Sequence, residues 1–106
     1  MAHYLFRAHY SQAGIQGVLK EGAASRMKAV ADLTASVGGR LEAAYWAFGD
    51  DDFICIAELP NNAAAAAVAT KVSSSGMGGI TTTVLLTAAE VDEARGMSVT
   101  YRPPGA

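Results

Sequence analysis

The chain has little charge and no long apolar run, and both scarcities exclude classes of protein. Only 17% of its 106 residues are charged, compared with about a quarter in an average domain. The net charge is −2, and no run of Lys or Arg offers an electrostatic footprint for a nucleic acid. No apolar stretch approaches the roughly 18 residues that a membrane span needs, and the first residues lack the layout of a signal peptide. We therefore expect a cytoplasmic protein with neither a nucleic acid nor a membrane as its partner.

Residues that carry covalent or metal chemistry are also scarce. The single cysteine, Cys55, cannot form an internal disulfide, and its apolar neighbours favour a small buried hydrophobic residue. The carboxylates Asp50–Asp52 lack the alternating spacing of a calcium loop. His3 and His9 lie six residues apart on one expected strand, roughly 20 Å in distance, so they do not share a metal. The glycine-rich segment 76–79 lacks the lysine and the following helix of a phosphate loop. We expect no metal ion and no other cofactor.

The chain is organised around the stretch 40–59, RLEAAYWAFGDDDFICIAEL, which predicts a β-hairpin. Two apolar, aromatic-rich runs flank Gly49–Asp52, residues that favour turns over strands. With Asp50 and Asp51 at the tip, the predicted opposed pairs are Phe48/Phe53, Trp46/Cys55 and Ala44/Ala57. Neither side of this ribbon is polar, whereas an antiparallel sheet with one solvated face alternates apolar and polar residues. Both faces need a cover, and we expect a partner subunit on the face that the helices leave open.

The remaining segments alternate between strand and helix patterns. Gly22 is expected to interrupt the first helical stretch, because glycine lowers helix stability by about 1 kcal/mol relative to alanine. Thr87 and Glu90 match a capping box at the start of a short last helix. The expected elements are strands at 3–10 and 79–86, helices at 11–37, 63–75 and 87–95, and an edge strand within the MSVTY segment at 97–101.

This order, β-α-β-β-α-β with a short terminal helix, predicts an α+β domain of the ferredoxin-like type. Right-handed crossovers place the strands of its antiparallel sheet in the order 4-1-3-2. We expect one domain over 1–106, with a core at about 3–94 and a C-terminal extension at 96–106.

Several short motifs, in order along nearly the whole chain, carry a family resemblance. They are Tyr4, Gly14-Ile15, Gly38-Gly39 before Leu41-Glu42-Ala43, Phe48-Gly49 with Asp52, Leu59-Pro60, and the closing stretch 81–93, TTTVLLTAAEVDE. Through them the chain resembles the GYD-domain family, small bacterial proteins of the dimeric α/β-barrel group. The resemblance implies a homodimer in which two sheets pack face to face, and it carries over no established activity.

One position departs from the motif that names this family, a glycine and a tyrosine–aspartate pair at the hairpin. Gly49 and Asp52 fit the motif, but Asp51 stands where the tyrosine is expected. If that tyrosine binds a ligand in relatives, this chain lacks the contact.

Arg7, His9, Trp46 and Asp52 form the candidate ligand-binding cluster, and no catalytic residue is identified. The topology brings the end of the first strand, the hairpin tip and the start of the fourth strand to one edge of the sheet. His9 can serve as a base or ligand, or be a half-exposed strand end. Arg7 can bind an anion or form a salt bridge at the interface, and Trp46 can stack on a ligand or fill the dimer core. Asp52 can orient His9 or cap the backbone of the turn.

Two functions fit these observations. The first is the binding of a small molecule, with or without catalysis, in a pocket between the sheet and the helices of a homodimer. The second is a non-catalytic regulatory or assembly module that acts through its surfaces, for example through the small-residue helix at 63–75. Analogy with other dimeric α/β barrels favours the first, at the level of the fold alone.

Overall fold

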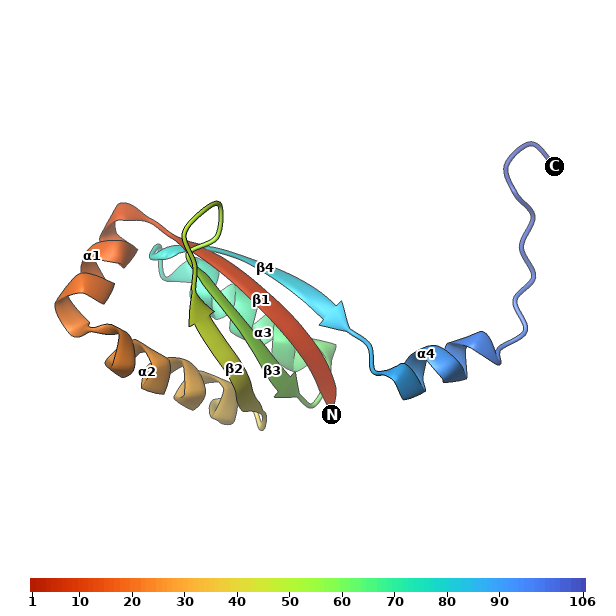
Figure 1. Ribbon diagram of the computed structural model, residues 1–106, viewed down its shortest axis with the longest axis horizontal. Helices are drawn as coiled ribbons and strands as arrows, with labels where there is room; N and C mark the ends of the chain where they lie inside the picture. Colours follow the sequence, from red (N-terminus) through yellow and green to blue (C-terminus); the bar gives the residue numbers. More distant parts are fainter.

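The computed structural model describes all residues from 1 to 106 and shows an α+β fold around one four-stranded sheet (Figure 1). Neighbouring strands are antiparallel, in the order β2-β3-β1-β4. This is the predicted order 4-1-3-2 counted from the opposite edge, so the predicted ferredoxin-like arrangement is confirmed. The elements are β1 (Ala2–Tyr10), α1 (Gln12–Glu21), α2 (Ala23–Ser36), β2 (Arg40–Trp46), β3 (Phe53–Leu59), α3 (Asn62–Ser74), β4 (Gly78–Leu85) and α4 (Ala88–Arg95).

The helical stretch after β1 is divided at the predicted residue. Ser11 caps α1, since its hydroxyl accepts a hydrogen bond from the Gly14 amide at 3.1 Å. α1 ends at Gly22, whose φ of +94° lies in a region that glycine adopts far more readily than other residues. The chain turns there and α2 begins at Ala23. Because of this turn, α1 contacts β1 and α2 contacts β2.

The core lies between one side of the sheet and the helices α2 and α3. Alternate residues of β1 and β3 are buried there, namely Tyr4, Phe6, Phe53, Cys55, Ala57 and Leu59. The helix α3 contributes Ala65 and Val68, and its many small residues allow a close approach to the strands. The Tyr4 hydroxyl donates a hydrogen bond to Asn62 Oδ1 at 2.6 Å, which ties β1 to the start of α3. The prediction that Cys55 is a small buried residue is confirmed.

The hairpin between β2 and β3 has a longer loop than predicted, and the predicted pairing is wrong by two residues. The observed pairs are Trp46/Phe53, Tyr45/Ile54 and Ala44/Cys55, in place of Phe48/Phe53, Trp46/Cys55 and Ala44/Ala57. The reason is that the Ala47 amide donates to the Asp52 carbonyl oxygen at 2.9 Å, which leaves all of segment 48–51 in the loop. Phe48 is consequently fully exposed at the loop rather than paired in the ribbon.

A β-bulge in β2 changes the register a second time. Leu41 pairs with Ala57 and Ala43 pairs with Ile56, so Glu42 is the extra residue. Leu41 therefore packs against the core, whereas Ala43 lies on the other side of the sheet, next to Ile56. Bulges of this kind re-aim side chains, and the Glu42 side chain also reaches the side that carries no helix.

That side, here termed the open face, is covered by none of the helices. It has an apolar centre of Leu5, Ala43, Tyr45, Ile54 and Ile56, as the strand registers show. Polar residues surround this centre: His3, Arg40, Glu42 and Glu58 at one end, Arg7 and His9 toward the other, and Thr81 and Thr83 on β4. Tyr45 is 73% exposed although it lies among apolar neighbours.

Beyond β4 the chain leaves the sheet and projects outward as a C-terminal arm, residues 86–106 (Figure 1). The predicted capping box of Thr87 and Glu90 is present at the start of α4. All residues of the arm are exposed. The edge strand predicted at 97–101 is absent and that prediction is wrong, because the arm carries this segment away from the sheet edges. The radius of gyration is 16.9 Å, compared with about 13 Å for a compact domain of this length.

None of the helices combines the length and the apolar character that crossing a membrane requires.

Candidate functional site

A cavity lies between the sheet and the helices, at the end of β1. Its volume is about 490 Å³, within the range of roughly 300–1,000 Å³ that is usual for small-molecule sites. The end of β1, the start of β4 and all three helices of the core side contribute to its walls. Its apolar lining consists mainly of Val18, Ala29, Leu33, Val72 and Met77. The cavity therefore lies in the layer, and at the end of the sheet, where the sequence predicts a pocket.

The helix α1 forms one wall because a glycine lets it approach the α3–β4 connection. A Cβ atom at Gly14 would lie only 1.9 Å from the Met77 carbonyl oxygen. Ser11 holds the helix there, since its amide donates to the Met77 carbonyl at 2.9 Å and its hydroxyl to the Gly76 carbonyl at 2.9 Å. Gly17 also lines the cavity, but nothing lies within 4 Å of a Cβ atom placed on it. Gly14 thus allows α1 to form the cavity wall, and Gly17 leaves open space beside that wall.

Three charged side chains line the cavity and give it a positive balance. Arg26 and Glu21 form an ion pair at 3.7 Å, and Glu21 also accepts a hydrogen bond from the Ser25 hydroxyl at 2.8 Å. Lys71, on α3, takes part in none of the ion pairs of the chain. The cavity combines apolar walls with one cation that has no carboxylate partner.

The four residues predicted as a ligand-binding cluster lie on different sides of the sheet. Arg7 and His9 alternate with the core residues of β1 and belong to the open face. The His9 ring lies over Gly79, where a Cβ atom would come within 2.5 Å of His9 Cε1. Trp46 lies on the helix-covered side and packs edge-to-face on Phe53, with ring centroids 5.0 Å apart. Of the four, His9 is the one that borders the cavity.

Asp52 and Trp46 also differ in their hydrogen bonding. The Asp52 carboxylate accepts a hydrogen bond from the Tyr10 amide at 2.8 Å, and its own amide donates to the Ala8 carbonyl at 2.8 Å. These bonds tie the hairpin loop to the end of β1, which matches the capping alternative. Trp46 Nε1 is buried and has no acceptor.

Two ionisable groups have a pKa that departs from the ordinary value, and neither lies in the cavity. Burial raises the pKa of the Cys55 thiol to about 11. The pKa of the exposed Glu90 carboxyl is lowered, first by the hydrogen bond from the Thr87 amide and then by the Thr87 hydroxyl. Cys55 therefore cannot supply a thiolate nucleophile to the cavity, and Glu90 cannot supply a carboxyl group to it.

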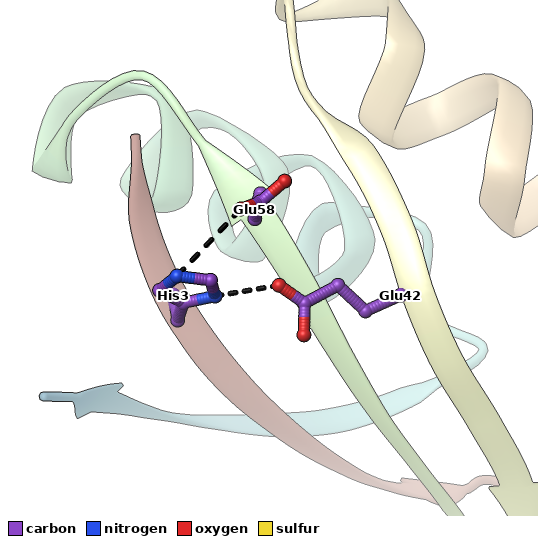
Figure 2. A group of neighbouring side chains, drawn as sticks. All are labelled: His3, Glu42 and Glu58. Atoms are coloured by element: carbon purple, nitrogen blue, oxygen red, sulfur yellow. Dashed lines mark hydrogen bonds and ion pairs between the residues drawn. The ribbon is translucent and has the colours of Figure 1, made fainter. Parts of the chain in front are cut away.

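A second group of polar side chains lies on the open face, at the opposite end of β1 (Figure 2). His3 stands between two glutamates: its Nδ1 is 2.5 Å from Glu42 Oε1, and its Nε2 is 3.6 Å from Glu58 Oε1. The other oxygen of Glu58 accepts a hydrogen bond from Arg40 Nε at 2.6 Å. His3, Glu42 and Glu58 come from β1, β2 and β3, respectively, and are here termed the histidine–glutamate cluster.

The sequence pattern alone does not predict this cluster, because its residues lie far apart in the sequence, at the end of the sheet away from the predicted pocket. The signal that finds it is strand register. Once β1 is known to pair with β3, His3 lies opposite Glu58. The bulge then brings Glu42, a residue that regular alternation does not assign to this side, next to His3.

Comparison with known proteins identifies a family for most of the chain. The sequence profile of the GYD domain matches residues 4–94, which span nearly all of the sheet and helices. No curated protein and no solved structure matches the chain. The matched region includes the cavity, the open face and most of the histidine–glutamate cluster. Given a profile match over most of its length, the chain belongs to the GYD-domain family, as its motifs predict.

Proposed function

We propose that this protein binds a small organic anion in the cavity between its helices and its sheet, and that it does so as a homodimer. The observation that carries the proposal is a cavity of about 490 Å³ with apolar walls and an unpaired cation, Lys71. Small-molecule sites typically have this make-up, a mostly apolar lining with few polar groups that fix the orientation of the ligand.

The charges of the cavity support an anionic ligand. Arg26 and Glu21 satisfy each other, so a ligand does not need to neutralise either of them. Lys71 is the remaining charge, and an ammonium group attracts a carboxylate or phosphate as a point charge. The apolar walls favour a ligand whose remaining part is hydrocarbon or aromatic, because burying that part releases it from water.

The exposed area of the chain supports a second copy as its partner. One chain exposes 7139 Å², whereas a compact monomer of this mass exposes roughly 5,600 Å². The excess, roughly 1,500 Å², is larger than the ~800 Å² that each partner buries in a standard interface. The C-terminal arm is exposed along its whole length, and no helix covers the open face.

The composition of the open face supports the same partner. An apolar centre with a polar rim is the usual anatomy of a protein interface. Face-to-face packing of two open faces brings the centres, which include Leu5, Ile54 and Ile56, into contact. It also leaves the cavity of each subunit on the outer, helix-covered side, so ligand entry does not require dissociation.

A thermal-shift assay with matched compounds tests the ligand proposal. The panel consists of acetate, hexanoate and benzoate, with the corresponding uncharged amides as controls. A compound at 100 times its dissociation constant adds about 2.7 kcal/mol to the free energy of unfolding. We expect at least one of the larger carboxylates to raise the melting temperature and its amide to do so far less.

Substitutions of residues that line the cavity test whether the ligand binds there. Gly17→Phe places a ring into the open space of the cavity and should abolish the shift, whereas Gly17→Ala should retain it. Lys71→Gln should weaken binding at least tenfold, and Lys28→Gln, which changes an exposed lysine outside the cavity, should not. The proposal fails if no carboxylate stabilises the protein, or if Gly17→Phe responds like the wild type.

One observation favours the alternative of an assembly module. The C-terminal arm exposes Val91, Met97, Val99 and Tyr101 to solvent. If the arm binds another protein, a partner that co-purifies with the full chain will be lost from a chain that ends at residue 87. Retention of the same partner by the shortened chain would exclude this role for the arm.

A further inference from the structure

The histidine–glutamate cluster has the composition and spacing of a metal site. One ligand atom from each of His3, Glu42 and Glu58 lies within 4.8 Å of the others. An imidazole nitrogen with carboxylate oxygens is a ligand set that zinc binds, at metal–ligand distances of about 2.0–2.2 Å. Around a tetrahedral zinc, such ligand atoms are roughly 3.3 Å apart. The ligand atoms must therefore move closer together, by rotation of the two glutamate side chains, to close the set around one ion.

We propose that His3, Glu42 and Glu58 bind a zinc ion with three protein ligands and one open coordination position. The ligands stand on three adjacent strands, which hold side chains more firmly than loops do. The bulge in β2 is what adds Glu42 to the set, since it turns this side chain toward His3. The site lies on the opposite side of the sheet from the cavity, at the polar end of the open face, and it does not depend on ligand binding in the cavity.

The groups around the cluster support its use as a site. Arg40 holds one oxygen of Glu58 at 2.6 Å, so the other oxygen is left facing His3. Hydrogen bonds of this kind orient metal ligands. Each nitrogen of His3 faces a carboxylate oxygen, Nδ1 that of Glu42 and Nε2 that of Glu58. Zinc binds one of the two nitrogens, so the glutamate that faces the other nitrogen leaves it to join the metal. Cysteine is a strong zinc ligand in other proteins, but Cys55 is buried on the other side of the sheet and cannot reach this site.

A shallow hollow lies beside the cluster, next to the proposed open coordination position of the zinc. It has a volume of about 230 Å³, and His3 and Glu42 form part of its wall. The rest of the wall is Ile56, Leu85, Leu86 and Thr87. Zinc sites that do chemistry or bind ligands keep one position for water or substrate, whereas structural sites are closed by four protein ligands. The hollow has room for a small molecule whose polar end coordinates the zinc and whose apolar part lies on the leucines.

Isothermal titration of the tag-free full chain with Zn²⁺, after removal of metals with a chelator, tests the proposal. We expect saturable binding of one ion per chain. His3→Gln, Glu42→Gln and Glu58→Gln should each weaken Zn²⁺ binding at least tenfold. The matched controls are His9→Gln, the other histidine of the same strand, and Glu93→Gln, an exposed carboxylate of α4, and both should bind Zn²⁺ within twofold of the wild type.

Replacement of zinc by Co²⁺ gives a second readout, because the visible absorption of Co²⁺ reports its coordination geometry. The proposal predicts a four-coordinate spectrum that the cluster variants lose and the controls keep. Circular dichroism identifies any variant that fails to fold, and Glu42→Gln, at the sheet edge, decides the question if Glu58→Gln is one of them. The proposal is overturned if the wild type shows no saturable Zn²⁺ binding, if the cluster variants bind normally, or if His9→Gln causes the same loss.

Discussion

The two glycines on α1 provide a sharp test of the cavity wall, because the same substitution should have opposite effects at positions three residues apart. Gly14 lies where a Cβ atom would be 1.9 Å from the Met77 carbonyl oxygen, and Gly17 lies where nothing is within 4 Å. Replacing each by alanine raises helix propensity by a similar amount, up to about 1 kcal/mol. The difference between the two variants therefore reports the contact with Met77.

The magnitude follows from the structure. An ordinary contact begins at 3.4 Å, so α1 must move by about 1.5 Å, the difference from 1.9 Å, to admit a Cβ atom at Gly14. That movement lengthens the bonds from Ser11 to Met77 and Gly76, each worth about 1 kcal/mol. Steric strain of roughly 1–3 kcal/mol adds to this loss. We expect Gly14→Ala to be destabilised by about 2 kcal/mol or more, and Gly17→Ala to be stabilised by about 1 kcal/mol.

Thermal and urea unfolding, followed by circular dichroism, measure both values. For a domain of this size, 1 kcal/mol shifts the melting temperature by about 4–8 °C, so the two variants should differ by more than 10 °C. All proteins must be compared at one concentration, because the stability of an oligomer depends on it. If Gly14→Ala unfolds at the same temperature as Gly17→Ala, α1 does not approach Met77 and the cavity wall is wrongly placed.

Four further predictions follow from individual residues. Asp52→Ala removes the acceptor for the Tyr10 amide and should cost about 1–3 kcal/mol, whereas Asp51→Ala, which removes no hydrogen bond, should cost little in the same urea titration. Cys55 should resist iodoacetamide in the folded protein at pH 8, because burial raises the pKa of its thiol to about 11; rapid alkylation would contradict this. Since only the unfolded thiol ionises between pH 9 and about 11, stability should fall across that range more in the wild type than in Cys55→Ala. Thr87→Ala should reduce the helical content of α4, since its cap contributes about 1 kcal/mol, and an unchanged circular dichroism spectrum would show that the cap is unimportant.

Features that depend on local chemistry could be predicted from the sequence. The break at Gly22 and the capping box of Thr87 each involve residues within four positions of one another. The strand order could also be predicted, because two right-handed crossovers allow few arrangements. From the strand order, the sequence predicts a pocket between the sheet and the helices at the end of the first strand, and the cavity lies there.

Features that depend on contacts between distant segments could not be predicted. The hairpin register is set in part by Asp52, whose backbone and carboxylate both bond to β1. The predicted ligand cluster combines residues at one end of the sheet, and proximity to an edge does not say on which side of the sheet a residue lies. For this reason the prediction groups Trp46, which packs on the helix-covered side, with Arg7, which belongs to the open face. The histidine–glutamate cluster needed both the register and the bulge, and neither is visible in the residue pattern.

The account depends most on the claim that a second copy covers the open face. Size-exclusion chromatography with light scattering at low micromolar concentration measures this directly. We predict a mass of twice 10.9 kDa for the wild type, and a single-chain mass for a folded Ile54→Glu variant, which places a charge at the centre of the apolar patch. A wild-type mass of one chain under these conditions would contradict the claim.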